Sequence, residues 1–312
     1  MAEASIPVDL FNPGQVFACL GFLEAADVLL GNAEGGFEWS ESPNVRFLLA
    51  ADGEQNPFEV ALRFLATAQI SRCVPTTFAV SQSSESPEED EDFGDELTDS
   101  LGLVILECFP QPEADQMTLP VQLQGSDGHL LSLSHWADGS GRNDFKLYSG
   151  NRSGASIARA MLSGTREKSQ KNKEIGDLET NGIESLWTTR RTELIAAPFD
   201  TLTPMGGSFN FDPRGAWTGI DAGYSPNDQR HGLSASPVVE LLAALGMEHA
   251  RPNQGTKRHV QYAVWSPSIP PMLARLALAG NAFGGGMRFF RFTLEMSGKN
   301  KVVTFAEEES ST

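Results

Sequence analysis

Two histidines and an aspartate are the closest approach to a metal or nuclease site in this sequence. His129 and His135 are six residues apart around an expected strand, and Asp138 follows them. Because side chains alternate between the two faces of a strand, this even spacing puts both histidines on one face. The alternative, which we favour, is that all three are ordinary polar residues of a strand and its turn.

Other catalytic signatures are missing. The sequence has no G-x-S-x-G, H-E-x-x-H or P-loop motif, and its cysteines, Cys19, Cys73 and Cys108, are too scattered for a metal cluster or a disulfide framework. Acidic residues crowd the segment 85–99, but carboxylates in a mobile run lack the geometry that acid–base catalysis needs. We therefore expect no enzyme activity, no metal and no cofactor, and reduced cysteines in the core.

Capping patterns predict the helices that must position any site. Asn12 suits an N-cap and Pro13 the first helical position, so we expect a helix over 13–30 in which Gln15 reaches back to the cap backbone and Gly31 ends the helix. Ser236 and Pro237 similarly begin a helix that Gly246 ends. We expect further helices and strands over 57–69, 101–109, 130–136, 153–162, 182–196 and 270–279, and a closing hairpin of 287–296 with 301–305.

These elements predict a mixed α+β fold with antiparallel strands. We expect an N-terminal α+β region, 1–180, that carries an acidic loop at 81–99, and a C-terminal α+β region, 181–312. A single domain is the alternative. No apolar run of membrane-spanning length and no secretory signal pattern is evident, which favours a cytoplasmic location without membrane contact.

The formal charge of −18 is unevenly distributed. Nine acidic residues between Glu85 and Asp99 and three at Glu307–Glu309 account for most of it, and we expect both segments to be solvated. From Arg142 to Arg191 the balance reverses, with ten Lys or Arg against six Asp or Glu. A local basic face for nucleic acid is therefore compatible with the acidic total.

Several segments, in order along the whole chain, resemble one family, the type I-U (also called I-G) CRISPR-associated effector-complex subunits. The segments are VDLFNPGQVFACLGFLEAADVLLG at 8–31, FKLYSGNRSG at 145–154, MGGSFNFDPRGAWTGIDAGYSPND at 205–228, PVVELLAALGMEHARP at 237–252 and YAVW at 262–265. The resemblance implies a short, large-subunit-like protein of the Cascade surveillance complex.

This resemblance also implies partners and a role. The partners would be the other effector-complex subunits, the crRNA, target double-stranded DNA and a helicase-nuclease that the complex recruits. The subunit would recognise the protospacer-adjacent motif and support R-loop formation in antiviral defence, while base pairing with the guide reads the sequence. The alternatives are an assembly subunit that contacts only protein and guide RNA, and a standalone metal-dependent hydrolase using the two histidines.

Side chains suited to nucleic acid occur in four places. Lys and Arg bind phosphate or guanine, and Asn and Gln pair with base edges. The candidates in the central signature are Arg142, Asn143, Lys146, Asn151 and Arg152. On a predicted helix, Arg190 and Arg191 follow Trp187, which suits stacking or an ordinary surface salt bridge equally. Arg214 belongs to a turn-rich block for which we favour a structural role. The polar loop with Asn253, Gln254, Lys257 and Arg258 is the best candidate for contacting duplex DNA.

Overall fold

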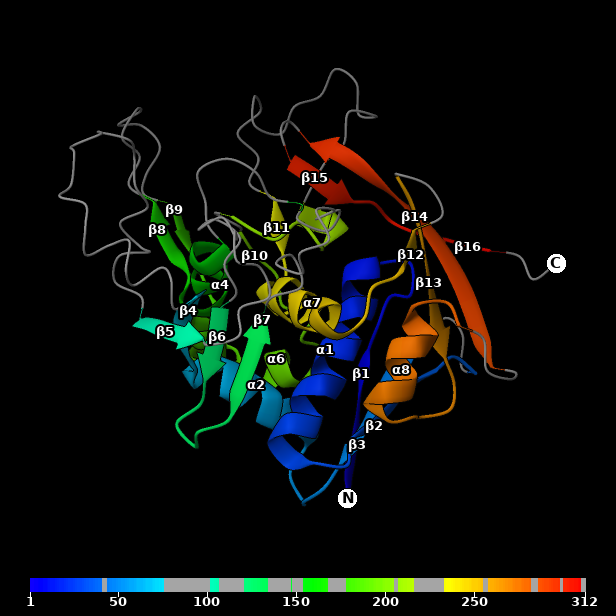
Figure 1. The fold of residues 1–312 in the computed structure, drawn as a ribbon, viewed down its shortest axis with the longest axis horizontal. Helices are drawn as coiled ribbons and strands as arrows, with labels where there is room; N and C mark the ends of the chain where they lie inside the picture. The colour runs from blue at the N-terminus through cyan, green and yellow to red at the C-terminus, as the bar shows by residue number, and fades with distance from the viewer. Residues whose placement is uncertain are drawn as a thin grey trace.

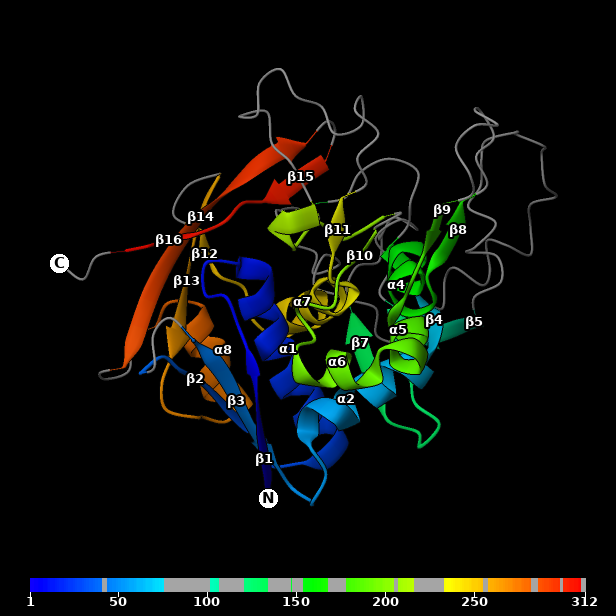
Figure 2. The same cartoon turned by 180° about the vertical axis from the view of Figure 1, so that it is seen from behind.

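The computed structural model shows the mixed α+β fold that the sequence predicts. Helices occupy the middle of the molecule and sheets flank them (Figure 1, Figure 2). The expected acidic loop at 81–99 lies outside the part of the chain that the structure describes. That part comprises residues 1–40, 44–75, 102–106, 121–133, 147, 154–167, 178–204, 207–215, 233–254, 258–281, 286–297 and 300–309.

Most of the described helices begin and end near their predicted bounds. They are α1 (Pro13–Leu30), α2 (Pro57–Thr67), α4 (Gly154–Ser163), α5 (Ile183–Thr189), α6 (Arg191–Ala196), α7 (Pro237–His249) and α8 (Pro271–Leu278), with a 3-10 turn η2 (Pro213–Gly215). The single helix expected over 182–196 was wrong, because Arg190 leaves the helical conformation at φ −132° and separates α5 from α6. Just before this break, the hydroxyls of Thr188 and Thr189 donate to carbonyls four residues earlier, a contact that bends helices.

The strands form several small sheets. One has the order β1-β3-β2, another β5-β4-β6-β7, two are paired strands β8-β9 and β10-β11, and one has the order β12-β13-β14-β15 with β16 also paired to β14. Pairing is antiparallel except between β4 and β5, which are parallel. The bounds are β1 (Ala2–Pro7), β2 (Glu34–Glu38), β3 (Arg46–Ala51), β4 (Gln69–Pro75), β5 (Gly102–Leu106), β6 (Val121–Gln124), β7 (Leu130–Leu133), β8 (Thr165–Glu167), β9 (Leu178–Thr180), β10 (Thr203–Pro204), β11 (Ser234–Ala235), β12 (Asn253–Gln254), β13 (His259–Trp265), β14 (Met287–Ser297), β15 (Asn300–Val303) and β16 (Glu307–Glu308).

The expected closing hairpin is confirmed as β14 and β15, which pair antiparallel. The acidic run, which was expected to be solvated, also forms a strand. Glu307 and Glu308 are exposed, yet as β16 they pair with Arg291 and Phe290 on β14. We call the sheet of β12 to β16 the C-terminal sheet. This pairing places three carboxylates, those of Glu307–Glu309, at its edge.

Helix α1 is the central element of the core. Its residues from Pro13 to Ala26 are all buried, and the Asn12 side chain accepts from the Gln15 amide, as expected of an N-cap. The side chain of Gln15 was expected to reach the cap backbone but accepts from the amide of Asp9 at 2.8 Å instead. By length and hydropathy α1 could cross a membrane, contrary to expectation. Its burial within the fold is typical of the core helix of a soluble protein.

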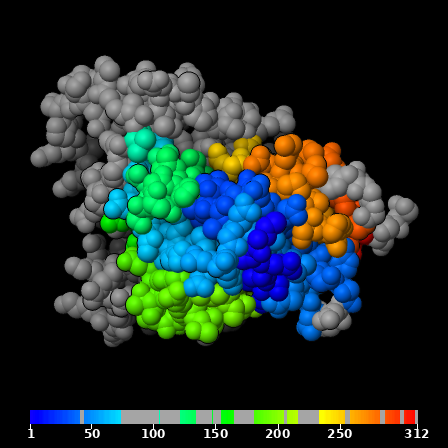
Figure 3. Space-filling view, turned by 90° about the horizontal axis from the view of Figure 1, so that it is seen from below, coloured from blue at the N-terminus to red at the C-terminus, as the bar shows by residue number. Residues whose placement is uncertain are grey.

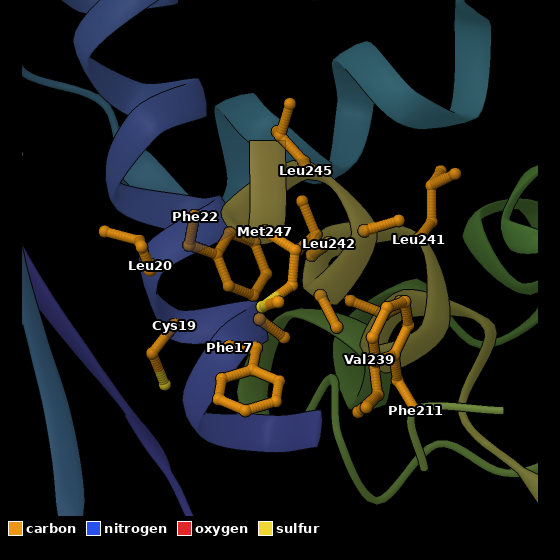
Figure 4. Close-up of a cluster of buried hydrophobic side chains, with 14 of the residues drawn as sticks. Phe17, Cys19, Leu20, Phe22, Phe211, Val239, Leu241, Leu242, Leu245 and Met247 are labelled. Atoms are coloured by element: carbon orange, nitrogen blue, oxygen red, sulfur yellow. The ribbon is translucent and has the colours of Figure 1, made fainter. Parts of the chain in front are cut away.

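Helices α1 and α7 cross with their backbones nearly in contact (Figure 4). A Cβ atom at Gly21 would lie 2.0 Å from the Leu242 carbonyl oxygen, and one at Gly246 would lie 2.2 Å from the Phe17 carbonyl oxygen. Gly246 was expected to end α7, but the helix continues to His249. The physical reason for glycine at 246 is therefore this close approach rather than a helix end.

One cluster of buried apolar side chains contains residues from both 1–180 and 181–312. Two hydrogen bonds join the two regions as well: the Tyr262 hydroxyl donates to the Leu10 carbonyl at 2.6 Å, and the Trp265 indole donates to the Gly35 carbonyl at 2.8 Å. On the inner face of the C-terminal sheet, Tyr262 stacks on Phe290. The sheet is thereby held against α1 by one face, and its other face is exposed at Arg291 but buried at Ala263 and Trp265.

The helix contact makes a testable prediction. Gly246→Ala places a methyl group against the Phe17 carbonyl, so we expect it to lower the free energy of unfolding by about 1–3 kcal/mol or more. Chemical denaturation followed by circular dichroism measures the change. Thr188→Ala, on the exposed side of α5, is the control and should change stability by about 0.5 kcal/mol or less. Equal stability of Gly246→Ala and the control would contradict the close approach.

Candidate nucleic-acid interface

A buried carboxylate, that of Asp212, joins three segments that are distant in the sequence. The Asn12 side-chain amide donates to it at 3.1 Å, and the backbone amide of Ser236 donates at 3.1 Å. The guanidinium of Arg214 donates from Nε at 2.9 Å and from Nη2 at 2.7 Å. Asp212 therefore connects the N-caps of α1 and α7 and neutralises its charge with Arg214.

Glu240 is a second carboxyl group in the same network and is fully buried. It accepts from the backbone amide of Asp212 at 2.7 Å and from that of Phe211 at 3.3 Å. Burial raises the pKa of Glu240 to about 8, against the opposing effect of the Asp212 amide. Glu240 is therefore protonated in neutral solution. The buried network then holds one cation, Arg214, and one anion, Asp212.

Arg214 is committed to this network rather than to the surface. Besides Asp212, it contacts the Phe199 carbonyl at 2.7 Å and the Asp200 carboxylate at 3.4 Å, and only about a fifth of its side chain is exposed. These are the contacts of a structural turn, the role that the sequence favoured for this block.

The arginines at the α5–α6 break also have internal partners. Arg190 binds the carboxylate of Glu193 and the Leu202 carbonyl. Arg191 binds Glu59 on α2 at 2.5 Å, and its guanidinium lies 4.4 Å from the centre of the Trp187 ring. The stacking expected beside Trp187 is present and joins α6 to α5, while the ion pair with Glu59 joins α6 to α2.

Several predicted site residues lie outside the described part of the chain and keep the status of predictions: Arg142, Asn143, Lys146, Asn151, Arg152, Lys257, His135 and Asp138. His129 is described and pairs with Asp127 at 3.0 Å beside the β6–β7 turn. Among the described residues, no three His, Cys, Asp or Glu side chains are grouped to hold a metal. Cys19 and Cys73 are free thiols, and burial raises the pKa of Cys73 to about 11.

Asn253 and Gln254 of the predicted polar loop form β12, a strand of the C-terminal sheet. Asn253 pairs with Gln261 between β12 and β13, and Gln261 pairs with Arg291 between β13 and β14. Directly paired residues of antiparallel strands point to the same face, so these three side chains form a row. We call this row of Asn253, Gln261 and Arg291 the outer polar face. Arg258, just before β13, is out of phase with this row, since it lies opposite the buried Leu294, and it is not part of the row.

The outer polar face is open to solvent. Asn253, Arg258 and Arg291 are exposed, and Gln261 is half-buried. Among the described residues, neither Arg258 nor Arg291 forms an ion pair with a carboxylate. The row therefore offers two amide side chains and one guanidinium group on one surface, with the exposed Arg258 near its end at the start of β13, a set that suits phosphate and base edges.

Sequence reasoning found one end of this surface but missed Gln261 and Arg291. Their signal was present, because in HVQYAVW at 259–265 and FFRFTL at 289–294 the polar residues alternate with buried apolar ones. The register that places them beside Asn253 was not readable from either strand alone. In comparisons with protein-family models, curated proteins and solved structures, nothing matched this chain.

The buried network predicts a pH dependence of stability. The pKa of Glu240 is near 4.5 when unfolded and about 8 when folded, so its contribution is complete below about pH 4.5 and is lost as the pH rises toward 8. Glu240→Gln stays neutral throughout. We expect the stability of the wild type, relative to Glu240→Gln, to fall by on the order of a few kcal/mol between pH 5 and 8. Urea denaturation across this range measures the difference, and parallel profiles of the two proteins would contradict the prediction.

Proposed function

We propose that this chain is a non-catalytic subunit of a type I CRISPR RNA-guided surveillance complex in the cytoplasm, and that it contacts the protospacer-adjacent motif of target DNA. Five segments that resemble the type I-U subunits, in order along the chain, support the family part of the proposal. The partners are the other subunits, the crRNA, the target duplex and a recruited helicase-nuclease. The proposal assigns this chain no reaction of its own.

The outer polar face carries the DNA-binding part of the proposal. Asn253 and Gln261 are side chains of the kind that pair with the N6 and N7 edge of adenine. Arg291 suits guanine or phosphate, as does the exposed Arg258 beside the face at the start of β13. All of them belong to β-strands or the turn between them, and a packed sheet holds such groups more rigidly than a free loop does. Guide base pairing would read the target, so the subunit needs to read only a short motif and the backbone.

A role in assembly alone is the second candidate, and the surface of α8 favours it. Met272, Leu273 and Leu276 are 71, 40 and 48 % exposed. The segment that includes α8 lies at the surface beside the N-terminal segments (Figure 3). Large exposed apolar side chains grouped on one helix are typical of a contact with another protein. In this case the subunit would be held in the complex through α8 without contacting DNA.

The test is duplex binding by the reconstituted complex at a stated salt concentration. We expect Arg258→Gln/Arg291→Gln to weaken binding about tenfold or more and to reduce the slope of log affinity against log salt by up to about 2, because each lost phosphate contact contributes about 0.9. Asn253→Ala/Gln261→Ala should reduce discrimination between motif and non-motif duplexes, by about 1–3 kcal/mol for each paired base contact that is lost.

The matched control is Arg46→Gln/Arg63→Gln, which removes the same charge from exposed sites on β3 and α2 and should leave binding unchanged. If both arginine pairs behave like the wild type, DNA contact through the outer polar face is excluded. If Met272→Ser/Leu276→Ser is the one variant that releases the subunit from the complex, the assembly role replaces DNA contact as the proposed function.

A further inference from the structure

The acidic segment Glu307–Glu309 contacts the residues that form the outer polar face. In β16, Glu307 pairs with Arg291, which places their side chains on the same face of the sheet. The Gln261 side-chain amide donates to the carboxylate of Glu309. Two of the three groups of the outer polar face, Gln261 and Arg291, thus have a carboxylate from this segment as a neighbour or partner.

Further contacts hold the segment in place. The guanidinium of Arg288 binds the carboxylate of Glu308 through two hydrogen bonds of 2.6 and 2.7 Å. The Glu309 amide donates to the Phe289 carbonyl at 2.8 Å, and the Ala306 amide donates to the Phe11 carbonyl at 2.7 Å. Ala306 is buried, so the segment is anchored at one end while its carboxylates lie along the sheet edge.

We propose that Glu307–Glu309 is a built-in competitor of nucleic acid for the outer polar face. This proposal rests on the proposed function, since it concerns the regulation of the same surface. Carboxylate and phosphate oxygens accept hydrogen bonds from the same guanidinium and amide donors. A phosphate that approaches Arg291 and Gln261 therefore meets donors that already have anionic neighbours, and binding requires these carboxylates to move aside.

The segment is bound weakly enough for such an exchange. β16 has only two residues, and Glu307 and Glu308 are exposed. Exposed ion pairs contribute about 0–1 kcal/mol each, and short edge segments open locally at a small fraction of the global unfolding free energy. Only molecules in which the segment is detached are competent to bind, and the apparent affinity is the intrinsic affinity multiplied by their fraction. If the segment is detached in about a tenth to a third of molecules, binding is therefore three- to tenfold weaker than without the segment.

Charge removal tests the competition. Glu307→Gln/Glu309→Gln keeps the shape of both side chains and the strand pairing but removes the anions. We expect this variant, in the reconstituted complex, to bind duplex DNA about three to ten times more tightly than the wild type at equal salt. The matched control Glu3→Gln/Glu34→Gln removes the same charge from exposed sites on β1 and β2 and should stay near the wild-type affinity.

A second readout separates displacement from simple repulsion. In the wild-type complex, the Glu309 amide should exchange with deuterium faster when DNA is bound, because its bond to Phe289 is broken when the segment leaves the sheet. Faster exchange together with tighter binding of Glu307→Gln/Glu309→Gln supports competition. If that amide stays protected, or if the variant binds no more tightly than the control, competition is overturned although the wild type still binds. If no version of the complex binds DNA through this subunit, the proposed function fails, and competition fails with it.

Discussion

A carboxylate enclosed in an apolar interior must be matched by donors, and the rest of this structure depends on how Asp212 is matched. Its donors come from Asn12, Arg214 and Ser236, so that one charge links residues up to 200 positions apart. Removing one partner from such a buried pair costs about 3–5 kcal/mol, because the other charge is left uncompensated. Asp212 therefore fixes the relative position of the N-termini of α1 and α7, and the neutral form of Glu240 avoids a second buried anion.

The helix crossing follows from the same constraint. Once their N-terminal ends are joined, α1 and α7 lie close enough for Gly21 and Gly246 to contact the opposite backbones. Phe17 on α1 then packs against Tyr262 and Phe292 of the C-terminal sheet. This chain of contacts turns Tyr262 and Phe292 inward, so that Gln261 and Arg291, which have the opposite parity, face outward. Farther along β13, Trp265 has the parity of Gln261 but is buried against Phe37. The outer polar face is thus a consequence of how the core is packed.

Local signals in the sequence were sufficient where the determining contacts are local. Asn12 with Pro13, and Ser236 with Pro237, predicted the starts of α1 and α7 because capping involves residues within one turn. The role of Gly246 was misjudged because it depends on packing against α1. The partner of Gln15 was misjudged by a few residues only, since its side chain accepts from the Asp9 amide rather than from the cap backbone. For the site, the arginines at 190, 191 and 214 looked available in the sequence. The carboxylate partners of Arg190 and Arg214 are three and two residues away, near enough in the sequence for an ion pair to be suspected. The partner of Arg191 is 132 residues away and could not be predicted.

The net charge of −18 bears on what kind of nucleic-acid contact such a surface can make. Over distances up to the Debye length, about 8 Å at physiological salt, an acidic protein repels DNA, so long-range attraction cannot bring the two together. Two exposed arginines provide little phosphate neutralisation, whereas Asn253 and Gln261 beside them provide hydrogen bonds that depend on the base. The same repulsion suppresses sequence-independent binding, which is almost entirely electrostatic. An acidic subunit with a small polar face is therefore suited to contact a short motif only after the rest of a complex has brought the duplex to it.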